Sequence, residues 1–131
     1  MSTSSSIKEE ISLKKFKEKV LNDFRTICLS REISILGRRE VLLGRGKFGI
    51  FGDGKELPQV VMSHFFKNGD FRSGYYRDLT ILLSQDLLSA REFFSAIYGH
   101  PDQIYERMAG GRQMVGHFLT DLIDENKEWI N

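Results

Sequence analysis

The stretch SLKKFKEKVLNDFRTICLSREISILG, residues 12–37, is the longest periodic segment of the chain and decides its fold class. Its apolar side chains recur at three- and four-residue steps, the spacing of one face of an α-helix: Leu13, Phe16, Val20, Phe24 and Ile27. Ser12 is suited to cap this helix, because its hydroxyl can accept a hydrogen bond from a free backbone N–H group. The pattern continues through Leu36, so we expect the helix to end at Gly37.

The composition limits the classes of protein to which the chain can belong. Its 131 residues fit one domain, and a net charge of +1 gives no long-range field toward nucleic acid or membrane. No apolar run approaches the roughly 20 residues of a membrane helix. The polar start, residues 1–11, reads as a disordered lead-in without the apolar block of a signal peptide. Cys28, the only cysteine, is expected to be a buried, inert thiol, and we predict a cytoplasmic protein.

The rest of the chain reads as short helices joined by glycine-rich loops. GRGKFGIFGDG, residues 44–54, is a loop, and Pro58 suits the first turn of a helix that Asn68-Gly69 would end. Residues 78–88 read as a buried helix or a short strand. Ser89 and Glu92 have capping-box spacing and open a helix that ends at Gly99. We predict a mostly helical chain over residues 12–131.

Two further segments complete this prediction. A short helical piece is expected after Pro101, carrying Ile104 and Tyr105. The segment MAGGRQMVGHF, residues 108–118, reads as another glycine-rich loop, in which the backbone can approach a ligand closely.

Several loop motifs have a plainer interpretation than a functional site. Gly-Asp-Gly at residues 52–54 is best read as a β-turn rather than a metal site. The basic glycine loop that carries Arg45, Lys47 and Lys55 is read as solvated. His64 and His100 are read as structural or exposed, and the histidines and the cysteine lack metal-ligand spacing.

The tripeptide Tyr75-Tyr76-Arg77 offers a guanidinium fork beside phenol donors, a combination that can hold a diphosphate. The alternative is a packed tyrosine with Arg77 paired to Asp78 or Asp70. In the loop GGRQMVGH, residues 110–117, His117 can donate a hydrogen bond or carry a proton near neutral pH. The alternative there is a hydrogen-bonded loop histidine.

Taken in order and at their separation, these blocks resemble one family. GDFRSGYYRDLT (69–80) and GGRQMVGHF (110–118) are similar to two blocks of the decarboxylating component of 2-oxo acid dehydrogenase complexes, and GIFGDGKELPQVVM (49–62) resembles the helix start that precedes them. The nearest resemblance is to the N-terminal part of the alpha chain, or of a fused alpha-beta chain, of the branched-chain (2-oxoisovalerate) type. It covers about residues 13–118.

The resemblance implies roles for five residues. Tyr76 and Arg77 match residues that hold the diphosphate of thiamine diphosphate, and His117 matches a catalytic histidine on the substrate side of the cofactor. Arg112 and Gln113 match the loop that lines the same pocket. The family uses thiamine diphosphate with magnesium to decarboxylate a 2-oxo acid and passes the acyl unit to the lipoyl group of a partner acyltransferase.

The resemblance also implies what this chain lacks. It ends before the family's magnesium motif, and the beta part is absent, so we expect the opening segment of a longer α/β enzyme, incomplete and inactive alone. Tyr75 and Val115-Gly116 depart from the family pattern, so the resemblance does not determine which 2-oxo acid is the substrate, although it favours a branched-chain acid. Partners would be a beta-type subunit or domain and the lipoyl acyltransferase. Uncovered apolar faces predict self-association. The rival hypothesis is a small helical interaction or regulatory module without catalysis.

Overall fold

The computed structural model describes residues 12–66, 70, 72–107, 110–112 and 116. Over these residues the chain forms four helices and no strand: α1 (Leu13–Leu42), α2 (Glu56–Ser63), α3 (Leu79–Ser84) and α4 (Ala90–Tyr98). The predicted mostly helical fold is therefore confirmed, while the α/β fold of a larger enzyme stays a prediction. The predicted lead-in, residues 1–11, lies outside the described residues.

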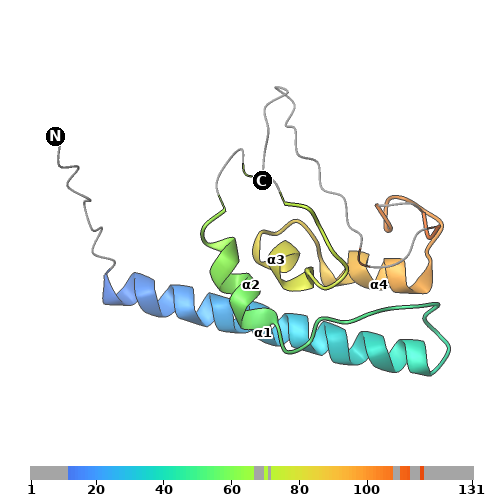
Figure 1. Ribbon diagram of the computed structural model, residues 1–131, viewed down its shortest axis with the longest axis horizontal. Coiled ribbons are helices and arrows are strands. Elements are labelled where there is room, and N and C mark those ends of the chain that lie inside the picture. The colour runs from blue at the N-terminus through green and yellow to red at the C-terminus, as the bar shows by residue number, and fades with distance from the viewer. Residues whose placement is uncertain (1–11, 67–69, 71, 108–109, 113–115, 117–131) are drawn as a thin grey trace.

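Helix α1 is the base on which the other three helices pack (Figure 1). Ser12 caps it as predicted, because its hydroxyl accepts a hydrogen bond from the backbone N–H of Lys15 at 3.4 Å. The expected end at Gly37 is wrong, since the helix continues to Leu42. Gly37 is buried, and a Cβ atom there would collide with the ring of Phe51. The contact with Phe51 therefore explains why a glycine stands inside the helix, although it is about 1 kcal/mol less favourable there than alanine.

The apolar core lies between the C-terminal half of α1 and helices α3 and α4. Its centre is Leu82 and Ile97, which are 1% and 0% exposed. The segment that was expected to be a helix or a strand forms helix α3. The other buried residues of the core cluster are Ile33, Leu79, Leu83, Leu88, Phe93 and Ala96. The core thus joins helices that lie up to about 60 residues apart in the sequence.

Helices α2 and α4 follow the predicted cap signals at most of their ends. Pro58 lies in the first turn of α2, but this helix ends at Ser63, five residues before Asn68. The chain there tightens into i to i+3 bonds, such as the 3.0 Å bond from Phe65 N to Met62 O, which end an α-helix. At α4 the capping box of Ser89 and Glu92 is present, and Gly99 ends the helix in the left-handed conformation, as predicted.

The short helix expected after Pro101 is wrong, because residues 101–107 form turns. The side chain of Asp102 accepts a hydrogen bond from Ile104 N at 2.9 Å, and its carbonyl accepts bonds from Tyr105 and Glu106. Ile104 is 78% exposed, so no apolar contact holds a longer helix in place.

The N-terminal half of α1 extends beyond the core (Figure 1). Leu13 and Phe24, two members of the predicted apolar stripe, are 67% and 61% exposed. Cys28 is exposed as well, which contradicts the prediction of a buried thiol. Periodicity identified the helix correctly but not the extent of the surface that covers it. Over the described residues, no helix has the combination of length and apolarity that crossing a membrane requires.

Candidate functional site

Three loops that the sequence singled out meet around Tyr76 and Arg77. A Cβ atom added to Gly52 would lie 2.7 Å from the carbonyl oxygen of Arg77 and 3.2 Å from its Cβ. A Cβ atom added to Gly116 would lie 2.8 Å from both Cα and Cβ of Tyr76. Because only glycine allows backbones to approach so closely, the loops that contain Gly52 and Gly116 enclose this dipeptide. Gly116 is buried and has a φ of +97°, which other residues rarely adopt.

Tyr76 and Arg77 occupy the two central positions of a closed turn. Its ends, Tyr75 and Asp78, are joined twice: Asp78 N donates to Tyr75 O at 3.0 Å, and Tyr75 N donates to Asp78 Oδ2 at 2.9 Å. Arg72 donates to the same carboxylate oxygen at 2.8 Å. The alternative in which Arg77 pairs with Asp78 is therefore wrong. Among the ion pairs of the described residues, Arg77 takes part in none.

The side chains of this turn stack on one another. The ring centroids of Tyr75 and Tyr76 are 3.9 Å apart, and the guanidinium carbon of Arg77 lies 5.2 Å from the centroid of Tyr76. Hydrogen bonding to Tyr76 is the main cause that holds the pKa of the Tyr75 phenol above its ordinary value. A half-buried cation thus lies beside phenol groups, an arrangement that can donate several hydrogen bonds to an anion.

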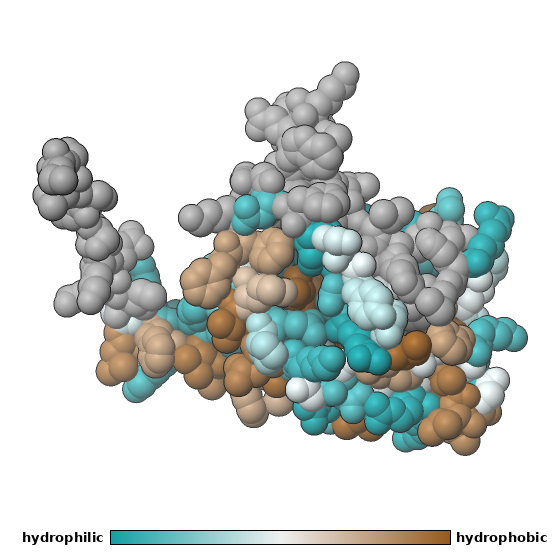
Figure 2. All heavy atoms as spheres, viewed as in Figure 1, coloured by the Kyte–Doolittle hydropathy of each residue, from teal (hydrophilic) through white to brown (hydrophobic). Residues whose placement is uncertain are grey.

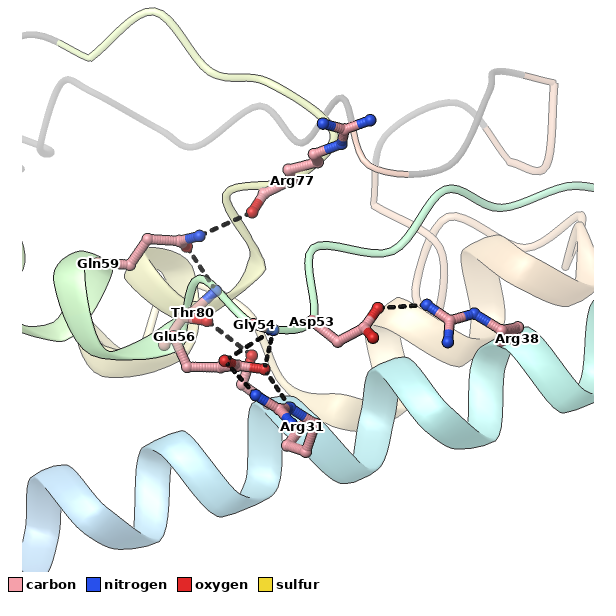
Figure 3. A network of polar contacts seen from close by, with 9 residues as sticks. Arg31, Arg38, Asp53, Gly54, Glu56, Gln59, Arg77 and Thr80 are labelled. Atoms are coloured by element: carbon pink, nitrogen blue, oxygen red, sulfur yellow. Dashed lines mark hydrogen bonds and ion pairs between the residues drawn. The ribbon is translucent and has the colours of Figure 1, made fainter.

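Gln59 of α2 holds the backbone of the turn, and sequence reasoning missed it. Its Nε2 donates to the carbonyl oxygen of Arg77 at 2.9 Å, and its Oε1 accepts bonds from Thr80 N at 3.1 Å and Ile81 N at 3.3 Å. These bonds supply the cap that Asp78 does not give to α3. Figure 3 shows the guanidinium of Arg77 pointing away from this network. The only sequence signal was a glutamine beside the apolar face of α2.

Glu56 and Arg31 form a second contact that the sequence did not predict. Arg31 donates to both carboxylate oxygens, at 2.6 and 2.8 Å, and Gly54 N donates to the same group at 3.0 and 3.1 Å. The bond from Arg31 is the main cause that lowers the pKa of Glu56 to about 2, against a burial that raises it. The pair fixes the start of α2 against α1 (Figure 3).

The Gly-Asp-Gly segment forms the predicted turn. Lys55 N donates to Gly52 O at 3.2 Å, and Gly54 has a φ of +93°. The side chain of Asp53 pairs with Arg38 of α1. With the contacts of Glu56, these bonds position Gly52 against Arg77.

Of the residues predicted to line the pocket, Arg112 is described and exposed, whereas Gln113 and His117 lie outside the described residues. The loop that leads to them is anchored at its start. Gly111 N donates to the buried carboxylate of Glu106 at 2.9 Å. A side chain at Gly111 would also collide with the backbone of Gly99 at the end of α4. The described part of this loop is therefore fixed at Gly111 and again at Gly116.

The basic loop and the other histidines have structural contacts. Arg45, Lys47 and Lys55 are exposed, as predicted for this loop. Arg45 also donates to both carboxylate oxygens of the buried Glu40, which accepts a further bond from Tyr98 at 3.0 Å. His64 bonds Asp23 at 2.9 Å, and His100 accepts a bond from Asp102 N at 3.2 Å. Both histidines therefore have the structural contacts expected of them.

Within the described part of the chain, no group of three or more His, Cys, Asp or Glu side chains could hold a metal ion. Comparisons of the chain with protein-family models, curated proteins and solved structures found no match. The geometry around Tyr76 and Arg77 and the motif resemblance are therefore the two observations that bear on function.

Proposed function

We propose that this chain supplies diphosphate-binding and substrate-side residues of a thiamine diphosphate-dependent 2-oxo acid dehydrogenase. One observation carries the proposal: Tyr76 and Arg77 lie at the tip of a closed turn against the backbones of Gly52 and Gly116. The three segments that supported the resemblance are distant in the sequence, yet they are neighbours at this point. A chance match of short motifs would not require them to meet.

The residues at this turn fit a diphosphate group. Arg77 offers a planar set of donors without an ion-pair partner among the described residues, and Tyr76 offers a phenol beside it. Gln59 donates a hydrogen bond to the carbonyl oxygen of Arg77, which fixes the peptide behind the guanidinium. When bound, thiamine diphosphate supplies the electron-accepting ring for decarboxylation. In this proposal Arg112, Gln113 and His117 line the substrate side.

The charge of the ligand predicts the strength of binding by this chain alone. Arg77 compensates only part of a diphosphate's charge, and the described residues offer no cluster of metal ligands. Binding by the chain alone is therefore expected to be weaker than micromolar, without decarboxylation. Magnesium ligands, a beta-type partner and a lipoyl acyltransferase belong to the complete enzyme. The substrate class is a 2-oxo acid, with a branched-chain acid favoured.

Nuclear magnetic resonance titration of the full chain tests the proposal. Thiamine diphosphate with magnesium should shift the amide signals of Gly52, Arg77 and Gly116, and thiamine without its diphosphate should not. Arg77→Gln should abolish the shifts, and Arg25→Gln, at an exposed arginine of α1, should leave them unchanged. The proposal fails if thiamine produces the same shifts or if neither ligand affects these amides. Micromolar binding would instead overturn the expectation that the chain needs a partner.

The rival function is a helical interaction module without a cofactor. One observation favours it: the apolar side chains on the N-terminal half of α1 are exposed, as a surface that binds another protein would be. The same titration separates the two functions, because an interaction module has no reason to distinguish thiamine diphosphate from thiamine.

A further inference from the structure

The apolar stripe on the N-terminal half of α1 consists of the exposed Leu13, Phe16, Val20 and Phe24 and of Ile27, which is half-buried. The first four are between 47% and 67% exposed, and every residue from 13 to 22 is exposed. Figure 2 shows apolar side chains gathered along this part of α1 and continuing toward α2. A helical segment of this length is marginal in water by itself, because most helical stability in proteins comes from packing of one face. The stripe therefore needs a cover that the described residues do not provide.

The stripe is symmetric in both spacing and residue type. Its steps are three, four, four and three residues, centred on Val20. Two phenylalanines stand at equal distances from Val20, and the aliphatic residues Leu13 and Ile27 stand at equal distances beyond them. In an antiparallel two-fold pair centred on Val20, this symmetry would place phenylalanine opposite phenylalanine and an aliphatic residue opposite an aliphatic residue. The contact would then be apolar along its whole length, which suits the pairing of one patch with itself in a two-fold dimer.

We propose that residues 13–27 of α1 form an antiparallel, two-fold contact with the same residues of a second copy of the chain. Val20 then lies opposite Val20, Phe16 opposite Phe24, and Leu13 opposite Ile27. This surface is separate from the turn at Tyr76, so the inference holds whether or not the chain binds a cofactor.

The charges beside the stripe favour the antiparallel direction. Lys14, Lys15, Lys17 and Lys19 gather in the first two turns of α1, with Glu18 as the acidic residue among them. In a parallel pair these clusters would lie side by side and repel one another. An antiparallel pair centred on Val20 places them in opposite halves of the contact, and it also opposes the two helix dipoles.

The exposed area is sufficient for a specific contact. A large apolar side chain that is half exposed has roughly 100 Å² still to bury, because full burial of an aromatic side chain removes about 150–250 Å². Four such stripe residues and the neighbouring Leu21, which is 54% exposed, give about 500 Å² per copy. Two copies reach the total of about 1,000 Å² that marks a biological interface.

Disulfide cross-linking tests the register directly. In a Cys28→Ser background, Val20→Cys should form a covalent dimer under mild oxidation, because the two-fold axis passes beside this position. The matched control is Asn22→Cys, which is also exposed but lies about 200° around the helix from Val20. The proposal predicts dimer for Val20→Cys and monomer for Asn22→Cys. Equal yields, or cross-linking of Asn22→Cys alone, would overturn it.

Sedimentation of the uncross-linked chain tests whether the contact forms without a covalent bond. The natural chain should sediment as a dimer at tens of micromolar, and Val20→Glu should shift it to a monomer. Asn22→Glu should leave the dimer intact. Circular dichroism of each variant should show a folded chain, since residue 20 lies outside the core. A folded natural chain that stays monomeric overturns the proposal. This holds also if the monomer instead binds vesicles of anionic lipid through its basic, apolar helix. A dimer unaffected by Val20→Glu overturns it equally.

Discussion

Acid should destabilise this protein through Glu56 more than through an exposed carboxylate, and the Glu56→Gln variant isolates the effect. Glu56 is 3% exposed, and its carboxylate accepts two hydrogen bonds from Arg31 and one from the backbone N–H of Gly54. Its pKa of about 2 in the folded chain compares with about 4.3 for an unperturbed glutamate. Because the folded pKa is the lower one, the stabilisation is complete above the unfolded pKa and is lost as pH falls toward the folded pKa.

The difference between the two pKa values sets the magnitude. It corresponds to about 3 kcal/mol of unfolding free energy at neutral pH. Linkage predicts that about 0.6 kcal/mol is lost by about pH 4 and about 2 kcal/mol by about pH 3. The exposure of Arg31, whose side chain is 45% accessible, makes these values upper estimates because solvent screens part of the ion pair.

Urea unfolding followed by circular dichroism gives the unfolding free energy at several pH values. The natural chain and Glu56→Gln should differ most at neutral pH, with the natural chain more stable, and the difference should shrink to about a third as pH falls to about 3. Glu32→Gln, at an exposed position of α1, is the control and should run parallel to the natural chain. If Glu56→Gln also runs parallel to the natural chain throughout this range, the electrostatic reasoning is refuted.

Three further substitutions test the packing around the core and the site, each measured by urea unfolding. Gln59→Leu should destabilise the chain by about 2–3 kcal/mol, because two buried backbone N–H groups and the half-buried carbonyl of Arg77 lose their partner. A loss below 1 kcal/mol would mean that water replaces these bonds. Gly37→Ala should cost about 1–3 kcal/mol through overpacking against Phe51, and a gain of about 1 kcal/mol, as in an open helix, would contradict the packing. Ser89→Ala should cost about 1 kcal/mol by removing the cap of α4, and an unchanged stability would show that the capping box contributes nothing.

Local signals predicted the elements well where one residue type carries the signal. Ser12 begins α1 because its hydroxyl reaches a backbone N–H three residues away, and Ser89 begins α4 in the same manner. Gly99 ends α4 because its φ of +66° suits glycine. The same reasoning failed at Gly37, where the glycine serves a contact with Phe51 from a later loop. A glycine in a sequence does not state whether it is needed for its conformation or for its small size.

The candidate site could be predicted only in part. Tyr76 and Arg77 stood out because arginine beside phenols suggests anion recognition, whereas nothing in the local sequence identified the partners of Gln59 and Glu56. Their roles come from bonds to groups about 20 residues away, the carbonyl of Arg77 and the guanidinium of Arg31. Such partners depend on how α1 and α2 cross, which no local pattern states.

The sequence by itself determined that the chain is helical and where most helices begin, because caps and apolar spacing act over one or two turns. Only the tertiary structure decided which faces are buried: the C-terminal half of α1 lies in the core and its N-terminal half does not. It also brought Gly52 and Gly116 against the turn at Tyr76. The physical reason is that burial depends on the surface supplied by distant segments. A periodic stripe specifies an apolar face but does not contain the identity of the surface that covers it.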